Sequence, residues 1–450
     1  MPNSNEPSLR HPPAELIRRH NICVESFFSS FNGVFLGLTI FVAPVVAVVG
    51  LDANPLELTI LVCAYPLGAF LGPVWAILGR RLGMKNLVTL MATLASLPML
   101  LIFWVHDAMV FTLLVTFAQL MVSAMRMGQS SMYRISYPKE LRGRMLGRLT
   151  FWTYMTLVPC VLLTGWLLDK SREMYRILYP LAGVCELFAA YCYAQIVIPH
   201  LEEKKNRPRF SLNGNLQNIE RIVSQDKLYM HFQLAFFLVG GSFFMTRHVV
   251  ILLAREQFEF SALELALCLS VLPQLLLAVS SPMWGRILDH IGIMRCRVLI
   301  SSMLGASLIM FFSGFLLGLP ILLYLGAILR GTSEGGGQLT WFLASTSFAH
   351  RSEDVPLYNG IHFVLNGTRG LILPWVGSIL FVLIGFSEVL VAGVLCLLSL
   401  PILLRALTFN DDRLQKATIK PNTVSELASH PPFGKELRSD TAPMTTKSAP

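Results

Sequence analysis

Long runs without a charged residue limit what this chain can fold into more than any other feature. Several runs contain no Asp, Glu, Lys or Arg, and each has the roughly 17 to 25 residues that cross a bilayer as an α-helix. The clearest are Phe27 to Leu51, Leu58 to Gly79, Asn86 to Val105, Ala108 to Met125, Leu149 to Leu168 and Leu265 to Gly285. Only 14% of the residues are charged, against roughly 25% in a soluble domain. The sequence predicts an all-α integral membrane protein, because lipid cannot satisfy open strand edges.

More polar or longer stretches supply the remaining helices. The uncharged stretch from Val298 to Leu329 is too long for one crossing, and Gly318 and Pro320 divide it into two helices. Spans with a few polar residues are Ile177 to Ile198, Leu228 to Ala254, Leu357 to Ile384 and Val389 to Leu404. We therefore expect about twelve transmembrane helices.

The basic residues gather in alternate loops, as they do on the cytoplasmic side of a membrane. The loops predicted to be cytoplasmic carry Arg80, Arg81 and Lys85, the bases from Arg134 to Arg148, and Arg286, Arg295 and Arg297. The opposite side has only Lys170, Arg172, Arg176 and Arg255. Both termini are thus predicted to be cytoplasmic. Anionic lipid headgroups account for the net charge of +9, so we expect no nucleic-acid partner.

The chain divides into two similar halves. Residue types recur at one constant offset in Pro73 and Pro282, Trp75 and Trp284, Gly83 and Gly292, Gly128 and Gly337, and Gln129 and Gln338. The expected organisation is a cytoplasmic segment (1–24), an N-terminal six-helix bundle (25–199), a cytoplasmic linker (200–227), a C-terminal six-helix bundle (228–408) and a disordered cytoplasmic tail (409–450).

This organisation, together with two loop motifs, resembles the major facilitator superfamily of secondary transporters over about residues 20 to 408. That family has a Gly-x-x-x-Asp-Arg/Lys-x-Gly-Arg/Lys-Arg/Lys motif after the second helix and a half-repeat after the eighth. The motif residues kept here are Arg81, Gly83 and Lys85 in the first copy, and Gly285, Asp289 and Gly292 in the second. The first copy has Ala76 and Arg80 at its Gly and Asp positions. The resemblance implies a gating role for both loops and a central cavity lined by helices one, four, seven and ten.

A few charged residues fall at mid-depth, where an arginine costs roughly 2.5 to 3.5 kcal/mol unless it faces a cavity or a partner. Arg330 lies about 15 Å along its helix from Pro320, and Arg369 about 16 Å from Tyr358. With Arg126 they predict a positive cavity that favours an organic anion or a zwitterion. The candidate substrate-binding residues are Arg330, Arg369, Arg126, Gln119, Asn366 and Gln338. Two alternatives are a structural ion pair of Arg330 with Glu334 and a bond from Arg369 to a backbone carbonyl or to Glu334.

Coupling to a proton needs a carboxylate near the midplane, and the candidates are Glu334 and Glu186. No nucleotide-binding, zinc-protease or nucleophile-elbow motif is present. We expect a non-enzymatic transporter without metal or cofactor, a monomer in the plasma membrane (the inner membrane in a bacterium), whose partners are the bilayer, a small solute and a coupling proton. Two alternatives are a sensor or assembly protein of the same fold, favoured by Arg80 at the acidic motif position, and a membrane-embedded enzyme or scramblase.

Overall fold

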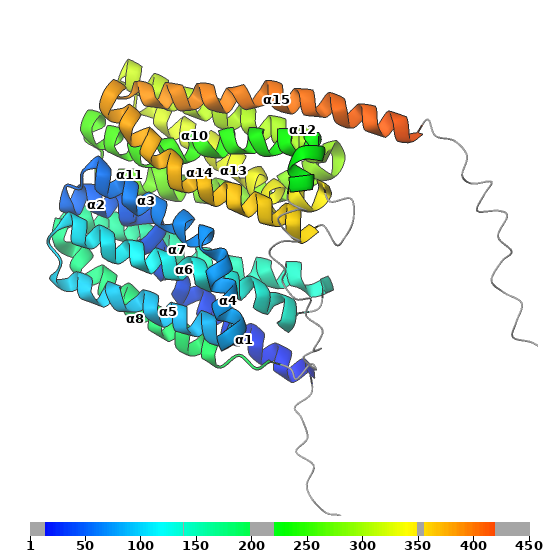
Figure 1. Ribbon diagram of the computed structural model, residues 1–450. Coiled ribbons are helices and arrows are strands. Elements are labelled where there is room, and N and C mark those ends of the chain that lie inside the picture. Colours follow the sequence, from blue (N-terminus) through cyan, green and yellow to red (C-terminus); the bar gives the residue numbers. More distant parts are fainter. Residues whose placement is uncertain (1–13, 138, 199–219, 349–354, 419–450) are drawn as a thin grey trace, which may run out of the picture. The chain divides into compact units, whose positions relative to one another are not determined.

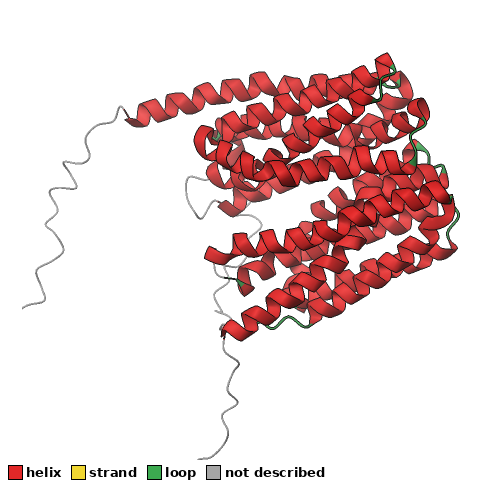
Figure 2. Cartoon of the chain, turned by 180° about the vertical axis from the view of Figure 1, so that it is seen from behind, coloured by secondary structure: helices red, strands yellow, loops and turns green. Residues whose placement is uncertain are grey.

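A computed structural model describes residues 14–137, 139–198, 220–348 and 355–418, and every regular element in these ranges is helical (Figure 2). The elements of the first half are α1 (Ala14–Leu36), the π-helix η1 (Gly37–Val42), α2 (Ala43–Leu51), α3 (Pro55–Phe70), α4 (Gly72–Leu82), α5 (Met84–Leu101), η2 (Ile102–Trp104), α6 (Ala108–Ser136), α7 (Lys139–Lys170), η3 (Arg172–Met174) and α8 (Tyr175–Ala194). Those of the second half are α10 (Lys227–Phe258), α11 (Ala262–Ala266), the π-helix η4 (Leu267–Val271), α12 (Leu272–Leu317), α13 (Ile321–Phe348), α14 (Val355–Ile384) and α15 (Ser387–Thr418).

The helices confirm the predicted all-α membrane class. Within the described ranges, ten helices are long and apolar enough to cross a membrane, and the pair α3 and α4, bent by 52°, makes an eleventh if it counts as one span. Helix α13 occupies the tenth predicted position with 28 residues. It is not among those ten, because Arg330, Glu334 and the glycines that follow dilute its apolar residues.

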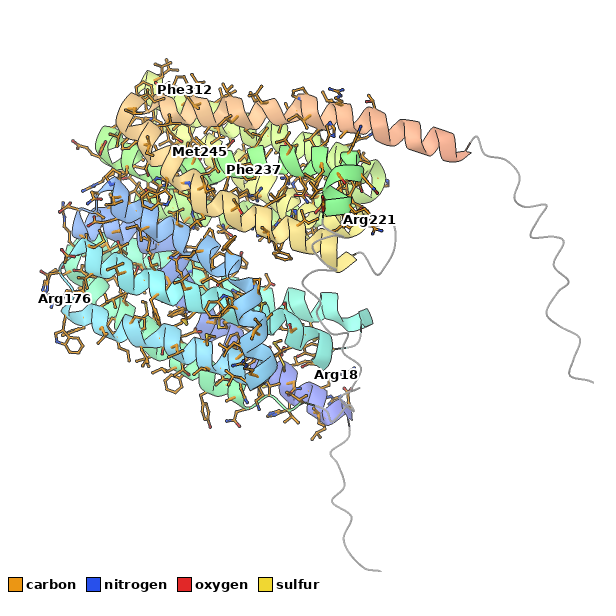
Figure 3. The ribbon with its side chains drawn as sticks, viewed as in Figure 1. Arg18, Arg176, Arg221, Phe237, Met245 and Phe312 are labelled. Atoms are coloured by element: carbon orange, nitrogen blue, oxygen red, sulfur yellow. The ribbon has the colours of Figure 1, made fainter. Side chains whose placement is uncertain are left out.

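The helix ends lie where the predicted topology requires them. Figure 3 shows Arg18 and Arg221, from predicted cytoplasmic segments, toward one end of the helices and Arg176 at the opposite end. Helix α1 begins at Ala14, before the uncharged run, and Glu15 in its first turn pairs with Arg18 and Arg19. At the other end of the chain α15 continues to Thr418, while residues 419–450 of the predicted tail lie outside the described ranges.

Two glycines break the chain at equivalent places in the two halves. Gly83 separates α4 from α5 with a φ of 84°, and Gly292 interrupts α12 with a φ of 76°. Glycine adopts such positive φ angles readily because it has no side chain, whereas other residues adopt them only at an energetic cost. The break at Gly292 divides α12 into the predicted eighth and ninth spans. Because both glycines have the same offset as the repeated prolines and tryptophans, their shared geometry supports an internal repeat.

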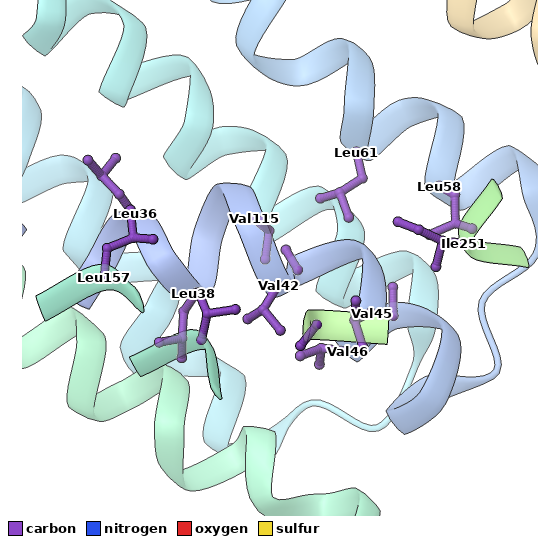
Figure 4. Close-up of a cluster of buried hydrophobic side chains, with 14 of the residues drawn as sticks. Leu36, Leu38, Val42, Val45, Val46, Leu58, Leu61, Val115, Leu157 and Ile251 are labelled. Atoms are coloured by element: carbon purple, nitrogen blue, oxygen red, sulfur yellow. The ribbon is translucent and has the colours of Figure 1, made fainter. Parts of the chain in front are cut away.

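Helix packing joins each half and then the two halves to one another (Figure 1). In the first half α1 packs on α7 and α8, and in the second α10 packs on α14 and α12 on α13. Across the halves α3 packs on α14, and α7 on α11. Figure 4 shows part of the buried core, a single cluster that includes Leu38, Val42, Leu58 and Val115 of the first half and Ile251 of α10. The helices up to Ala406 form one compact unit, and the last part of α15 belongs to a second.

Candidate functional site

Arg330 and Glu334 form an ion pair on α13. The Arg330 Nε atom lies 2.9 Å from Glu334 Oε1, and the two side chains are 9% and 18% exposed. The guanidinium carbon of Arg330 also lies 4.4 Å from the centre of the Phe243 ring. The contact at i,i+4 spacing supports the ion-pair alternative. The Glu334 carboxylate nevertheless remains partly accessible.

Further bases surround this pair and come from both halves of the chain. Arg247 of α10 interacts electrostatically with Arg330 and Glu334, and its Nη2 atom donates to the carbonyl of Ile40 over 3.1 Å. Tyr154 of α7 interacts with Arg126 and Glu334. We call Arg126, Arg247, Arg330 and Glu334 the central cluster. Its three arginines and one glutamate give it a net positive charge.

Tyr154 was not predicted as a site residue, and it links the halves at this level. Its hydroxyl donates to Gln274 Oε1 of α12 over 3.2 Å. Arg247 was not predicted as a site residue either, and it is partly buried beside the ion pair. Position along the helix could not reveal this, because it does not specify which face of α10 meets η1 and α13.

Arg369 is held away from the ion pair by contacts within the second half. Its Nη1 donates to the carbonyl of Phe236, which supports the backbone-carbonyl alternative, and its Nη2 donates to Asn366 Oδ1 over 2.5 Å. Arg297 of α12 lies beside the same Phe236 ring. Predicted to lie in a cytoplasmic loop, Arg297 is instead 3% exposed within the bundle.

Two predicted substrate-binding amides occupy other places. Gln119 of α6 is buried and donates to the carbonyl of Thr39 over 2.7 Å, so its amide nitrogen holds α6 against the first span. Gln338 lies on the exposed side of α13. Of the six predicted substrate residues, Arg369 contacts Asn366, while Arg126 is connected to the Arg330–Glu334 pair only through Tyr154, which interacts with Arg126 and Glu334.

Two buried carboxylates of the first half, Glu186 and Glu25, lie along α1. Glu186 of α8 is fully buried, and both of its oxygens accept from Asn32 Nδ2, over 2.9 and 3.1 Å. Glu25 accepts a hydrogen bond of 2.7 Å from the Tyr137 hydroxyl, while its Oε1 is buried without a partner. Arg126 interacts electrostatically with Glu186 as well as with Tyr154. Arg126 therefore interacts directly with one predicted proton-coupling carboxylate, Glu186, and only through Tyr154 with the other, Glu334.

The π-helix η1 provides acceptors for both halves. Four successive carbonyl oxygens accept side-chain hydrogen bonds: Leu38 from Tyr179, Thr39 from Gln119, Ile40 from Arg247 and Phe41 from Ser270, over 2.7 to 3.1 Å. The first two donors belong to the first half and the last two to the second. Ser270 itself lies in the other π-helix, η4. Single π turns are frequent at functional sites, but nothing in the sequence predicted either one.

The loop motifs are only partly described. Arg81 is exposed, Lys85 and Gly285 are partly buried, and Gly83 and Gly292 have the positive φ angles given above. The side chain of Asp289 lies outside the described part of the structure. In that part, no group of three or more His, Cys, Asp or Glu residues is arranged to hold a metal ion.

Comparison with known proteins gives a consistent result. The family model described as Major Facilitator Superfamily matches residues 26–355 and, a second time, residues 234–442. A variant of the nucleoside transporter NupG aligns with a TM-score of 0.68 and 11% identity, over 87% of this chain and 99% of that one. A POT family transporter in complex with a thioalcohol-conjugated peptide aligns with a TM-score of 0.63 and 13% identity, over 87% of this chain and 96% of that one. At these identities the structures show the fold alone. No curated protein sequence matches the chain significantly.

Proposed function

Because the chain belongs to the major facilitator superfamily, we propose that it moves a small organic anion or zwitterion across the membrane by alternating access, coupled to protons. Membership makes it a multi-pass secondary transporter and excludes the membrane-embedded enzyme, since the family is not enzymatic. The solute, the coupling ion, a monomeric state, the plasma membrane as its location, and the two bundles 25–199 and 228–408 as the moving parts belong to the proposal.

The central cluster is the observation that carries this proposal. Arg247 of α10 interacts electrostatically with Arg330 and Glu334 of α13, and Tyr154 of α7 interacts with both Glu334 and Arg126 of α6, so the cluster connects the two halves. A buried excess of positive charge is costly without a counter-charge, and the acid group of a solute supplies one. Glu334 gives the same site a partner for an ammonium group, which makes a zwitterion as suitable as an anion.

The ion pair also gives a route to proton coupling. Protonation of Glu334 would release Arg330 for the solute, and an arginine that binds the solute would in turn release Glu334. Such competition links two ligands through one group, which is what coupled transport requires. Glu186, reached electrostatically by Arg126, supplies a second carboxylate for the same exchange.

The binding test compares purified parent protein with Arg330→Gln and with Lys170→Gln, a control that removes an exposed charge at the end of α7. Each is heated with a panel of small carboxylates, phosphates, amino acids, amines and neutral drugs. We expect acids or zwitterions to raise the Tm of the parent and of Lys170→Gln, and to bind at least tenfold more weakly to Arg330→Gln, since a hydrogen bond to a charged group contributes about 1.5 to 3 kcal/mol.

The outcome that would overturn the substrate class is equal stabilisation of all three proteins by cations or neutral drugs. The transport test uses sealed vesicles with an imposed pH gradient and a solute from the panel. Accumulation that follows the gradient supports proton coupling. A ligand that binds but is not accumulated in either orientation of the gradient would favour the sensor, for which Arg80 at the acidic motif position is the sequence argument.

A further inference from the structure

Several cationic and polar side chains that do not belong to the central cluster gather near the Phe236 ring in the second half. The guanidinium carbons of Arg297 and Arg369 lie 4.4 and 4.0 Å from the centre of that ring. The two residues are 3% and 6% exposed and come from α12 and α14. Cation–π attraction explains why each stacks on the ring. It does not neutralise two positive charges that lie close enough to repel one another.

The hydrogen bonds of these arginines go only to neutral groups. Arg297 Nη1 donates to the Thr340 hydroxyl over 3.2 Å, and Arg369 donates to the Phe236 carbonyl and to Asn366. Within the described ranges, the structure shows no carboxylate paired with either one. The Nε atom of each is buried and has no hydrogen-bond partner there. Buried charges are normally paired, and among the residues that the structure describes no counter-charge accompanies these two arginines.

Two further side chains at the same ring have unused polar atoms. The His362 ring centre lies 4.5 Å from that of Phe236, and His362 Nδ1 lies 3.2 Å from Gln233 Oε1. Both residues are 1% exposed, and the Nε2 atoms of both have no partner in the described part of the chain. Unsatisfied polar atoms are rare in native interiors, and here four of them gather around one aromatic ring.

We propose that Arg297, Arg369 and Gln233 form a binding site for one small oxyanion, a carboxylate or a phosphate. The site is built by α10, α12 and α14 alone and does not include the Arg330–Glu334 pair. The anion balances the two guanidinium charges and accepts hydrogen bonds from their Nε atoms and from the Gln233 amide. Its source is either the acid group of the transported solute, in which case this site rests on the proposed function, or a free inorganic anion that stays bound in the second half.

The experiment measures saturable binding of radiolabelled inorganic phosphate, and of acetate, to the purified full chain by equilibrium dialysis at constant ionic strength. The variants are Arg297→Gln, Arg369→Gln, Arg330→Gln and the control Lys170→Gln. Beside any anion held at the central cluster, we expect one further anion per chain in the parent and in Lys170→Gln. This site should remain in Arg330→Gln, which loses only the central-cluster binding, and should bind at least tenfold more weakly in Arg297→Gln and Arg369→Gln. Arg297→Lys and Arg369→Lys, which keep the charge but lose the Nε donor, test the same geometry if a glutamine variant does not fold.

The parent protein decides the matter without any variant, because absence of saturable phosphate and acetate binding to it overturns the site. Loss of all saturable binding in Arg330→Gln, with binding kept in Arg297→Gln, also overturns it, since the anion would then occupy the central cluster. Competition by a solute that vesicles accumulate supports the site with the solute's acid group as occupant, and lack of competition supports it with a resident anion. Anion binding without any solute uptake leaves the site standing while the transport proposal fails.

Discussion

At the scale of single residues, position 240 must be glycine for Arg369 to keep its place. Arg369 crosses α10 with its guanidinium so close to Gly240 that an added methyl group would overlap the guanidinium carbon. At the neighbouring Gly241, the nearest atom to such a methyl group is a Leu373 side-chain carbon at 3.3 Å. The Leu373 side chain is flexible and can move aside. The absence of a side chain at 240 is therefore what allows Arg369 to reach Phe236.

Gly240→Ala should lower the free energy of unfolding by about 1–3 kcal/mol, the usual cost of overpacking. Gly241→Ala is the matched control. It should change stability by less than about 1 kcal/mol, because better helix propensity offsets the tight contact. Denaturant unfolding in detergent measures both. Equal losses in the two variants would show that Arg369 does not depend on the space above Gly240.

Glu186 is suited to carry a proton because its partner Asn32 can hydrogen-bond the carboxyl in either protonation state. Glu186→Gln keeps the shape and a hydrogen bond but cannot ionise. We expect it to fold and bind solute like the parent, yet to lose accumulation driven by a pH gradient while still exchanging solute across vesicles. Glu173→Gln, at an exposed surface pair, is the control. Unchanged gradient-driven uptake in Glu186→Gln would exclude this carboxylate from coupling.

Sequence reasoning anticipated contacts between residues close in the chain better than contacts between helices. The Arg330–Glu334 ion pair was one of the alternatives and is present, and Arg369 also contacts Asn366 three residues earlier, a pairing that was not predicted. Arg297 was missed because it follows Arg295 in a segment assigned to a loop, and its burial depends on how the helix after Gly292 packs on α10 and α13. Such contacts require knowledge of helix orientation that spacing does not contain.

At the scale of elements, α7 of the first half contacts α11 of the second through a side chain that binds the end of a helix. The Asp169 carboxylate accepts from the backbone nitrogens of Ala262 and Leu263, over 2.7 and 3.1 Å, at the first turn of α11. Gly165 lets the two helices approach, since a methyl group there would lie 2.9 Å from the Leu263 Cα atom. A side chain of one half thus caps a helix of the other, at the end predicted to face away from the cytoplasm.

Removing this cap should loosen the outer contact between the halves. Asp169→Ala is expected to destabilise the closed outer end by about 0.5–2 kcal/mol, the usual value of an N-cap, and to shift the population toward separation there. Spin labels at positions 170 and 256, with the exposed Cys23 replaced, report the distance between α7 and α10. Glu173→Ala serves as the control. If the distance distribution of Asp169→Ala is the same as that of the parent, Asp169 does not hold the two halves together at this end.

Helix type and number were predictable because the apolar runs are long, whereas irregular geometry was not. Helix α1 includes a charged turn before the uncharged run, in which Glu15 pairs with Arg18 and Arg19, and a definition based on uncharged runs excludes such a turn. The π turns at Gly37–Val42 and Leu267–Val271 have ordinary apolar sequences. The side chains that donate to the carbonyls of the first π turn lie on other elements, so only the assembled bundle supplies them.

At the scale of the whole molecule, the repeat predicts that the two halves respond alike to equivalent changes. Gly83→Ala and Gly292→Ala each place a side chain at a positive φ with an extended ψ (142° and 168°), a conformation essentially restricted to glycine that costs other residues about 1–3 kcal/mol. No neighbouring atom lies within 4 Å of an added methyl at either glycine, so backbone strain alone is tested. Unfolding in detergent should show similar losses for both. A loss confined to one variant would show that the halves do not share this turn.

The first π-helix has a consequence for how this chain tolerates changes in its length. A π turn closes its hydrogen bond over one more residue than an α turn, so η1 is an α-helical span carrying a single inserted residue. Deleting one residue between Gly37 and Val42 would restore a regular helix and leave α1 and α2 facing their present neighbours. The carbonyls that accept from Arg247 and Ser270 would then return to ordinary helical bonding. Deleting a single residue in the first span would therefore remove the two hydrogen bonds by which the second half holds η1.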